Sequence, residues 1–490
     1  MRIVLAFAVN TLFNFIVGLT VAKFLGPDEY GRFALAVQAA VVMQTLLFDW
    51  VKLSATRFYS ERARTHDPAL RATLETMFAA LAVLLIMLAL VLLRTGVRLE
   101  LGGPLVALAL LASITNGMFD FHTAMMRARF MDRDYFRLVF TKNIAALCLT
   151  VGGAFFFHSA IMALAGACIS IGGSVFTVRR RLHDALSTPS AFSAPSARKT
   201  LSYALPIVAA NFLYHFVPLF NRAIITHRYG FAETGQFSLA SDVGLRVVSA
   251  IGSALDVLLF QLAVAADEKH GLAEGKAQIA RNMVIVFALV APACMGLWLI
   301  LPSFDHLVVP AQFAMPFGYF ITLLLPGLFC HALVNYAINP VFQLARRTWP
   351  LICAAAVAAS FNVIVVTFGP VGTDATLIAE AQGGMFIVAL VVLLGLAAFT
   401  RPQWPAWRHI AKPTLGVAAM TAVLLPMRHM PPSLLTLLAQ VIVGALIYGL
   451  AVMILDIGDM RSIFLAKWRA RLTPAVAASA KWQDFIKVDE

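Results

Sequence analysis

The chain has 490 residues, of which 60% are hydrophobic and only 13% are charged. So few charges over this length exclude a soluble protein, and the long uninterrupted apolar runs exclude a closed barrel, so we expect an all-α polytopic membrane protein. The net charge of +13 could suit a nucleic acid, but the Lys and Arg residues cluster in alternate loops, which is the positive-inside pattern. We therefore expect no nucleic-acid partner.

Taken in order, the apolar segments predict about fourteen transmembrane helices, each near the length that a bilayer requires. The first six lie at residues 3–22, 33–53, 74–93, 104–124, 138–157 and 160–178. The next six lie at residues 203–226, 237–262, 283–301, 317–338, 350–368 and 377–399. Two more, at 413–427 and 434–455, complete the set. The penultimate segment is short, so twelve helices is the alternative.

This pattern divides the chain into a six-helix lobe, a linker, a second six-helix lobe, two further helices and a basic tail. Their predicted boundaries are 1–178, 179–200, 201–400, 401–455 and 456–490. Basic residues gather in the linker, in alternate loops and in the tail, which predicts that both termini are cytoplasmic. The first apolar run lacks a clear small-residue cleavage site, so we interpret it as a retained span.

One stretch occurs twice. Residues 26–36 read GPDEYGRFALA, and residues 230–240 read GFAETGQFSLA, at an offset of 230 − 26 = 204. In both places the stretch joins two long apolar segments. A repeat at this spacing predicts one helical unit used twice, with a functional site between the two copies.

Polar residues form one face of the eighth predicted span and a similar face of the second. In the eighth span these residues are Asp242, Arg246, Ser249, Ser253 and Asp256, which step by four and three. In the second span they are Gln38, Thr45, Asp49 and Lys52. Such a face must meet protein or water at membrane depth, because lipid imposes a cost of several kcal/mol per ion. The two faces predict a shared central cavity.

Asp242 and Arg246 lie four residues apart on one helix, so they can pair with each other and hold helices together. In the alternative interpretation, Arg246 meets an anionic head group inside the cavity and Asp242 orients it when the site is empty. The planar guanidinium suits a phosphate group, because two of its N–H donors can hydrogen-bond to two phosphate oxygens at once.

The seventh predicted span places Asn211, His215, Pro218 and Arg222 at steps of four, three and four. Pro218 can kink the helix and expose carbonyl groups to a cavity. Arg222 either binds substrate or extends to the interface, and His215 either carries a ligand or proton or packs in the interior. In the first span, Asn14 follows Asn10 by one turn and suits either an interhelical hydrogen bond or a substrate contact.

Three carboxylates, Asp49, Asp120 and Asp256, are candidates for binding a coupling ion. For Asp49 and Asp120 the alternative is an ordinary salt bridge to Lys52 or Arg127. The sequence contains no Walker-type stretch, HExxH, GxSxG or paired-cysteine pattern. We therefore expect no enzyme, no cofactor and no metal site.

Residues 25–35 resemble the first-loop signature of the polysaccharide biosynthesis family. These are Wzx-type flippases in the multidrug/oligosaccharidyl-lipid/polysaccharide exporter superfamily. Residues 310–314 and 343–348, and then Asn362, Gly369, Pro370, Gly372 and Ala375, are similar to later parts of that family's pattern. The resemblance covers residues 1 to about 400, and it departs at 371–375, where the family usually has a second glycine.

The resemblance implies two six-helix bundles related by a pseudo-two-fold axis along the membrane normal, plus two C-terminal helices. It implies a flippase in the bacterial inner membrane that works by alternating access. The cargo would be an undecaprenyl-pyrophosphate-linked oligosaccharide, moved from the cytoplasmic to the periplasmic leaflet for lipopolysaccharide, capsule or exopolysaccharide synthesis. Cationic cavity residues would hold the pyrophosphate, and here Arg246, Arg222 and Lys52 are the matching candidates.

The same resemblance implies coupling to H⁺ or Na⁺, and polymerase or export machinery as partners. An ion-coupled exporter of drugs or other small molecules is the alternative within the superfamily. A glycan polymerase or ligase would need a long periplasmic loop with Arg and His, which this sequence lacks. A scaffold would not need polar faces within the membrane, because such faces cost free energy. Both are therefore less consistent with this sequence.

Overall fold

The computed structural model describes residues 2–59, 65, 67–95, 100–182, 192–345, 347, 349–400, 402–459 and 461. Every regular element within these residues is helical. The predicted all-helical fold is therefore confirmed. The tail beyond residue 461 lies outside the described residues, as do parts of the predicted linker.

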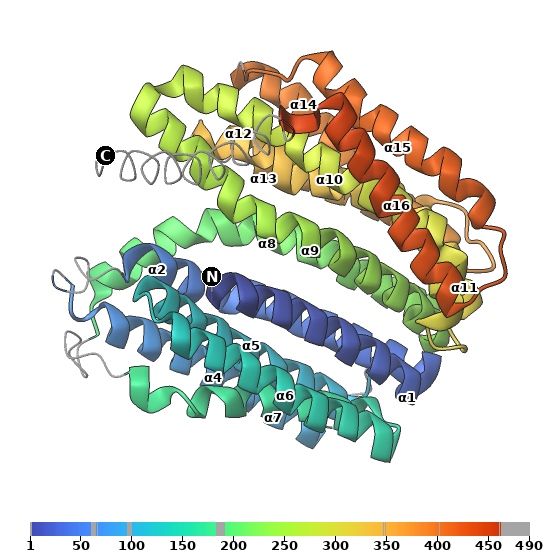
Figure 1. Cartoon of the computed structure of the whole chain (residues 1–490). Coiled ribbons are helices and arrows are strands. Elements are labelled where there is room, and N and C mark those ends of the chain that lie inside the picture. Colours follow the sequence, from blue (N-terminus) through green and yellow to red (C-terminus); the bar gives the residue numbers. More distant parts are fainter. Residues whose placement is uncertain are drawn as a thin grey trace, which may run out of the picture.

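The first part of the chain, up to Leu182, forms six long or medium helices and one short helical turn. These are α1 (Arg2–Leu47), α2 (Asp49–Phe58), α4 (Leu70–Thr95), α5 (Gly103–Ala128), α6 (Asp132–Phe157), α7 (Ala160–Phe176) and a 3-10 turn at Arg179–Leu182. They appear in blue to blue-green in Figure 1.

The second half begins with the two long helices α8 (Ala194–Tyr229) and α9 (Phe231–His270). It continues through α10 (Leu272–Leu307), α11 (Ala314–Leu333), a π-helical turn at Val334–Ile338, α12 (Asn339–Leu344), α13 (Trp349–Phe368) and α14 (Thr376–Ala397). A 3-10 turn (Ala398–Thr400), α15 (Trp407–Met427), α16 (Leu434–Leu455) and a last turn (Ile457–Asp459) complete the described chain.

Eleven helices among the described residues are long and apolar enough to cross a membrane. Helix α1 is one of these eleven although a kink divides it, whereas α7, with 17 residues, and α9, whose side chains at 253–258 are not described, are not among them. Eleven helices plus the second arm of α1, α7 and α9 give fourteen, in agreement with the sequence prediction. The short penultimate segment is the 21-residue helix α15.

The two copies of the repeated stretch adopt the same backbone conformation. Gly26 has φ 73° and ψ 173°, and Gly230 has φ 88° and ψ 178°. Glycine accepts this left-handed conformation without the strain that a Cβ atom would introduce. The sequence analysis left residues 23–32 between the first two predicted spans, but a single glycine turns the chain and the helix resumes at once.

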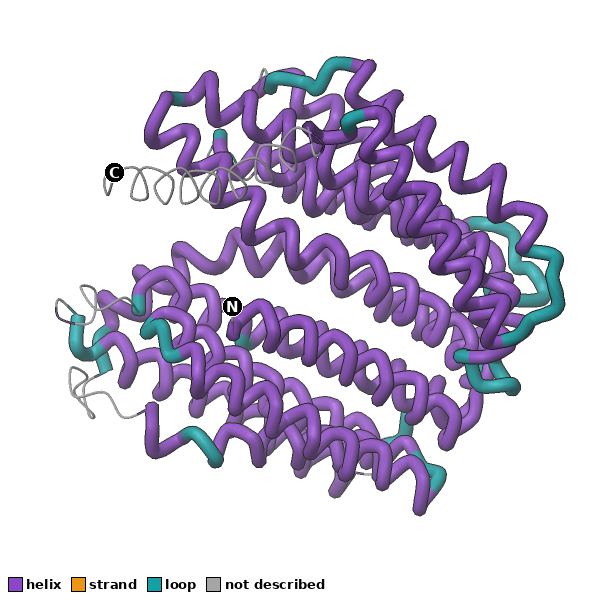
Figure 2. Tube along the Cα trace, in the orientation of Figure 1, coloured by secondary structure: helices purple, strands orange, loops and turns teal. Residues whose placement is uncertain are grey.

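Figure 1 shows the helices in two groups, α1–α7 below and α8–α14 above, with α15 and α16 on the outside of the upper group. We call these groups the first and second lobes. Gly26 and Gly230 lie at one end of the molecule, the kink end, where the lobes converge. Helix α2 and the beginning of α8 lie at the opposite end, the terminal end, toward which the first arm of α1 points back. Figure 2 shows the helices of the two lobes spreading apart toward that terminal end.

Helix α8 belongs to both lobes. At its start, Ala204 and Val208 are buried against Trp50 and Leu74 of the first lobe. Its later half packs in the second lobe, with Pro218 inside the helix between the two parts. The change of partner places the polar residues of α8 between the lobes, where the sequence analysis expects the site.

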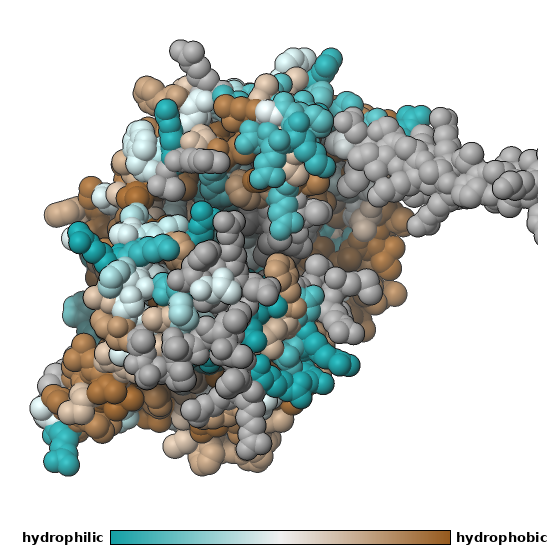
Figure 3. All heavy atoms as spheres, turned by 90° about the vertical axis from the view of Figure 1, so that its left-hand side faces the viewer, coloured by the Kyte–Doolittle hydropathy of each residue, from teal (hydrophilic) through white to brown (hydrophobic). Residues whose placement is uncertain are grey.

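The outer faces carry large hydrophobic side chains, as expected for surfaces in contact with lipid. Examples are Leu84 of α4, which is 63% exposed, and Leu435 of α16, which is 79% exposed. Figure 3 views the terminal end, where hydrophilic side chains gather between hydrophobic margins. The end toward which the lobes diverge therefore carries exposed polar surface.

Candidate functional site

Two cations, one from each lobe, meet at Asn14 in the first arm of α1. The ammonium of Lys142, on α6, donates to Oδ1 of Asn10 at 2.9 Å and to Oδ1 of Asn14 at 3.4 Å. The guanidinium of Arg246, on α9, donates to the backbone oxygen of Asn14. All four residues are partly exposed. We call them the cation cluster.

Neither cation of the cluster forms an ion pair with a carboxylate among the described residues. Their partners are neutral amide and carbonyl oxygens, which balance less of the charge than a carboxylate would. A cation held in this way between helices retains much of its attraction for an anion.

Gly18 makes the position of Arg246 possible. A Cβ atom at Gly18 would overlap the guanidinium of Arg246, so the arginine lies directly against the backbone of α1. Gly18 is the repeat equivalent of Arg222, because 222 − 204 = 18. The first lobe therefore has a gap where the second lobe has an arginine, and Arg246 fills it across the lobe boundary.

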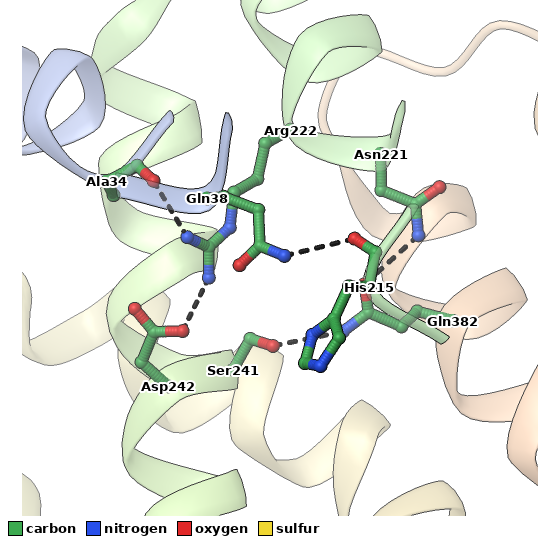
Figure 4. Close-up of polar contacts among 8 residues, drawn as sticks. All are labelled: Ala34, Gln38, His215, Asn221, Arg222, Ser241, Asp242 and Gln382. Carbon is green, nitrogen blue, oxygen red and sulfur yellow. Dashed lines mark hydrogen bonds and ion pairs between the residues drawn. The ribbon is translucent and has the colours of Figure 1, made fainter. Parts of the chain in front are cut away.

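Arg222 occupies a different, closed environment (Figure 4). It is only 2% exposed, donates to the backbone oxygen of Ala34 at 3.0 Å and pairs with the carboxylate of Asp242. Ala34 lies in the second arm of α1, so this arginine joins the lobes while its charge is balanced inside the second lobe. Nearby, the amide of Gln38 donates to the backbone oxygen of His215 at 3.0 Å.

A neutral amide network lies behind Arg222 in the second lobe. Asn221 donates to Oε1 of Gln382 at 3.0 Å, and Gln382 donates to the hydroxyl of Ser241 at 3.0 Å. All three residues are at most 2% exposed. The network links α8, α14 and α9, so it holds the helix that carries Arg222 in place.

A third polar group lies toward the terminal end. Lys52 donates to Asp120 at 2.8 Å, and the amide of Gln44 donates to the same carboxylate oxygen at 3.0 Å. For Asp120 the alternative of an ordinary salt bridge is thus confirmed, and its partner is Lys52. Asp49 is 8% exposed and lies one turn before Lys52 on α2.

Two sequence interpretations need correction. Asp242 and Arg246 do not pair with each other, because Asp242 pairs with Arg222 and Arg246 reaches Asn14. Arg222 does not extend to the interface, because it is buried. Helical spacing showed correctly that these groups share a face, but the nearest partner of each lies on another helix.

The other predicted site residues lie near this region without forming a single cluster. Asn211 and the ring of His215 are partly exposed on α8. The side chain of Asp256 lies outside the described residues. Sequence reasoning missed Lys142, although a lone lysine next to an asparagine within a predicted span was a usable signal.

The family model described as polysaccharide biosynthesis protein matches residues 20–310, more than half of the chain. No curated protein sequence matches the chain. The fold is similar to a lipid II flippase MurJ in an inward closed conformation, with a TM-score of 0.70 and 14% identity, covering 91% of this chain and 98% of that chain.

Two further similar structures are transporters. One is a multidrug resistance MATE family transporter of the MOP superfamily in an inward-facing conformation, with a TM-score of 0.56, 15% identity, and coverage of 80% and 95%. The other is a mutant of the Vibrio cholerae MATE transporter VcmN, with a TM-score of 0.52, 14% identity, and coverage of 82% and 95%. Identities this low show a shared fold.

Proposed function

The chain belongs to the polysaccharide biosynthesis protein family and has the fold of membrane transporters, and from this premise we propose that it is a flippase for lipid-linked oligosaccharides. The cargo would be an oligosaccharide on undecaprenyl pyrophosphate, carried from the cytoplasmic to the periplasmic leaflet of the bacterial inner membrane. Such a head group cannot cross about 30 Å of hydrocarbon unaided, because its polar groups would lose their hydration.

The observation that carries this proposal is the convergence of Lys142 and Arg246 on Asn14, with no carboxylate partner for either cation in the part of the chain that the structure describes. A pyrophosphate would replace the neutral oxygens of Asn10 and Asn14 and accept charge-assisted hydrogen bonds from both cations. Because the two cations come from different lobes, one bound anion would contact both lobes.

Arg222, with its charge balanced by Asp242, then has a positioning role and not a binding role. Lys52 is likewise engaged with Asp120, so both former candidates for binding pyrophosphate rank below Lys142 and Arg246. For ion coupling, Asp49 is the remaining candidate with a described side chain, because Asp120 is already paired. In this proposal the lipid tail stays in the bilayer while the lobes rock about the cluster.

The test uses a strain that lacks the gene and re-expresses wild type, Arg246→Ala or Lys142→Met at equal membrane levels. We expect the deletion to accumulate lipid-linked oligosaccharide on the cytoplasmic leaflet, and both variants to clear at least about 10-fold less than wild type. One lost charge-assisted hydrogen bond corresponds to about 1.5–3 kcal/mol. The readouts are the cytoplasmic-leaflet intermediate and surface polysaccharide.

The matched control is Arg281→Ala, which removes an exposed arginine paired with Glu274 on α10 and should clear the intermediate normally. Lys142→Met should also unfold at a temperature no lower than wild type, since it removes from between helices a cation that has no carboxylate partner among the described residues. If deletion leaves lipid-linked oligosaccharides unchanged, the flippase assignment is wrong and a drug-efflux screen follows. If the deletion strain accumulates the intermediate but both variants clear it as wild type does, the cluster is not the binding site.

A further inference from the structure

The two copies of the repeated stretch touch each other at the kink end, across the boundary between the lobes. A Cβ atom at Gly31 would overlap the backbone oxygen of Phe231 and lie 3.0 Å from the nitrogen of Gly235. A Cβ atom at Gly235 would overlap the backbone oxygen of Pro27 and lie 3.0 Å from the nitrogen of Gly31. Only glycine at both positions allows the two helices to come this close.

The contact is self-complementary. Pro27 and Phe231 are repeat equivalents, as are Gly31 and Gly235, since each pair differs by 204 residues. Gly31 contacts Phe231, and Gly235 contacts Pro27, which is the repeat equivalent of Phe231. The two sides of the contact are therefore equivalent. This reciprocity is the property of a two-fold interface, so a pseudo-two-fold axis passes between Gly31 and Gly235.

Side chains around the glycines add weaker contacts across the same boundary. The guanidinium of Arg32 lies 4.0 Å from the ring centroid of Phe231. The amide of Gln312 donates to the backbone oxygen of Lys23 at 2.9 Å, and Tyr30 packs edge-on against Phe313 with centroids 5.7 Å apart. None of these contacts is a carboxylate ion pair, so each can break without leaving a buried charge.

Each copy of the stretch is also fastened to the body of its own lobe. A carboxylate oxygen of Glu29 accepts a hydrogen bond from the backbone nitrogen of Ala160, at the start of α7, at 2.7 Å. Its equivalent, Glu233, accepts one from Ala375, just before α14, at 3.2 Å. A displacement at the glycine contact is therefore transmitted to a whole lobe and not absorbed by a flexible loop.

We propose that residues 26–35 and 230–239 form an interlobe clasp, a latch that holds the kink end shut through the glycine contact and releases it when the lobes rock. The clasp is strong enough to define one state because the backbones fit closely. It is weak enough to open because no ion pair joins residues 26–35 to residues 230–239, and Arg222, which donates to Ala34, keeps Asp242 as its partner when that hydrogen bond breaks. The inference rests on the proposed function only in assuming two alternating states of the lobes.

The test measures interlobe distances by electron paramagnetic resonance in the purified full-length protein, with its five native cysteines replaced. Spin labels at Phe157→Cys and Val371→Cys report on the kink end, because these exposed residues end α6 and follow α13. Labels at Arg57→Cys and Glu268→Cys report on the terminal end. We expect Gly31→Ala and Gly235→Ala to add a population with a longer kink-end distance and a shorter terminal-end distance.

The matched control is Gly296→Ala, because a Cβ atom there meets nothing within 4 Å and should change neither distance. Phe231→Ala is the second test variant, since it removes the contact with Arg32 without adding bulk, and it should also lengthen the kink-end distance. Unchanged distances in folded glycine variants would overturn the proposal. If the glycine variants do not fold, an unchanged kink-end distance in Phe231→Ala would overturn it instead. The distance measurements need no cargo. A failed flippase assay together with the expected distances would therefore contradict the proposed cargo and leave the clasp supported.

Discussion

Arg222 and Arg246 lie near the same interlobe boundary but in different electrostatic situations. Arg222 is 2% exposed and its charge is balanced by Asp242, whereas Arg246 is partly exposed and held by a backbone oxygen. A buried ion pair resists the loss of either member, because the remaining charge stays away from water. We therefore propose that Arg222 supports the architecture of the site and that Arg246 contributes to its chemistry.

Arg222→Ala should lower the free energy of unfolding by about 3 kcal/mol, because it leaves the carboxylate of Asp242 without its partner. The value is at the low end of the usual range, since the Asp242 side chain keeps 25% exposure. Denaturation in mixed micelles, followed by circular dichroism, measures the change. Arg281→Ala removes an arginine whose side chain is 52% exposed and should cost at most about 1 kcal/mol. Equal losses in the two variants would contradict the assignment of Arg222.

At the scale of the helices, the repeated stretch combines a turn with a connection to another helix. A left-handed glycine reverses the chain, and three residues later a glutamate binds a backbone nitrogen at the start of the last helix of its lobe. The first backbone nitrogens of a helix lack partners within it, and the helix dipole favours a negative group there. The glutamate therefore stabilises a helix start that is distant in sequence.

Glu29→Ala should free the first turn of α7, and Glu233→Ala the first turn of α14. Loss of such a capping interaction costs about 1–2 kcal/mol, so amide hydrogen exchange in that turn should accelerate about 5- to 30-fold. Exchange followed by mass spectrometry on peptides covering 160–164 and 375–379 measures this. Glu29→Gln retains a side-chain oxygen and serves as the control. Each alanine variant should affect only its own lobe, and faster exchange in both peptides would indicate general loosening instead.

For the whole molecule, the structure places two similar lobes around the cation cluster and the clasp. The lobes meet at the kink end and spread toward the terminal end, with α8 packed against both. The excess of Lys and Arg in the loops of the terminal end predicts that this end faces the cytoplasm. The kink end, with the clasp, would then face the periplasm.

Cysteine labelling tests this orientation in a variant without native cysteines. His270→Cys and Ala311→Cys introduce single thiols in exposed positions just beyond opposite ends of α10. Ala311→Cys should react with a membrane-impermeant maleimide in intact spheroplasts. His270→Cys should react only after the membrane is permeabilised, because basic flanking residues keep that end inside. The reverse pattern would invert the orientation and the proposed direction of transport.

The sequence by itself determined the class of the protein, the approximate number of spans, the internal repeat and the resemblance to its family. These features are local or periodic, because a bilayer forces each spanning segment to satisfy its own backbone hydrogen bonds. The residues on the polar faces were also identifiable, since helical spacing fixes which side chains share a face.

Only the tertiary structure decided which of those residues meet. Arg246 and Asn14 are 232 positions apart, and Lys142 and Asn14 are 128 positions apart, so no local pattern connects them. The pairing of Asp242 with Arg246, which local spacing allowed as one alternative, is wrong because Asp242 pairs with Arg222 on another helix. The contact of Gly31 with Gly235 likewise depends on how the two lobes dock. The sequence could not indicate this contact, because glycine has no side chain whose chemistry points to a partner.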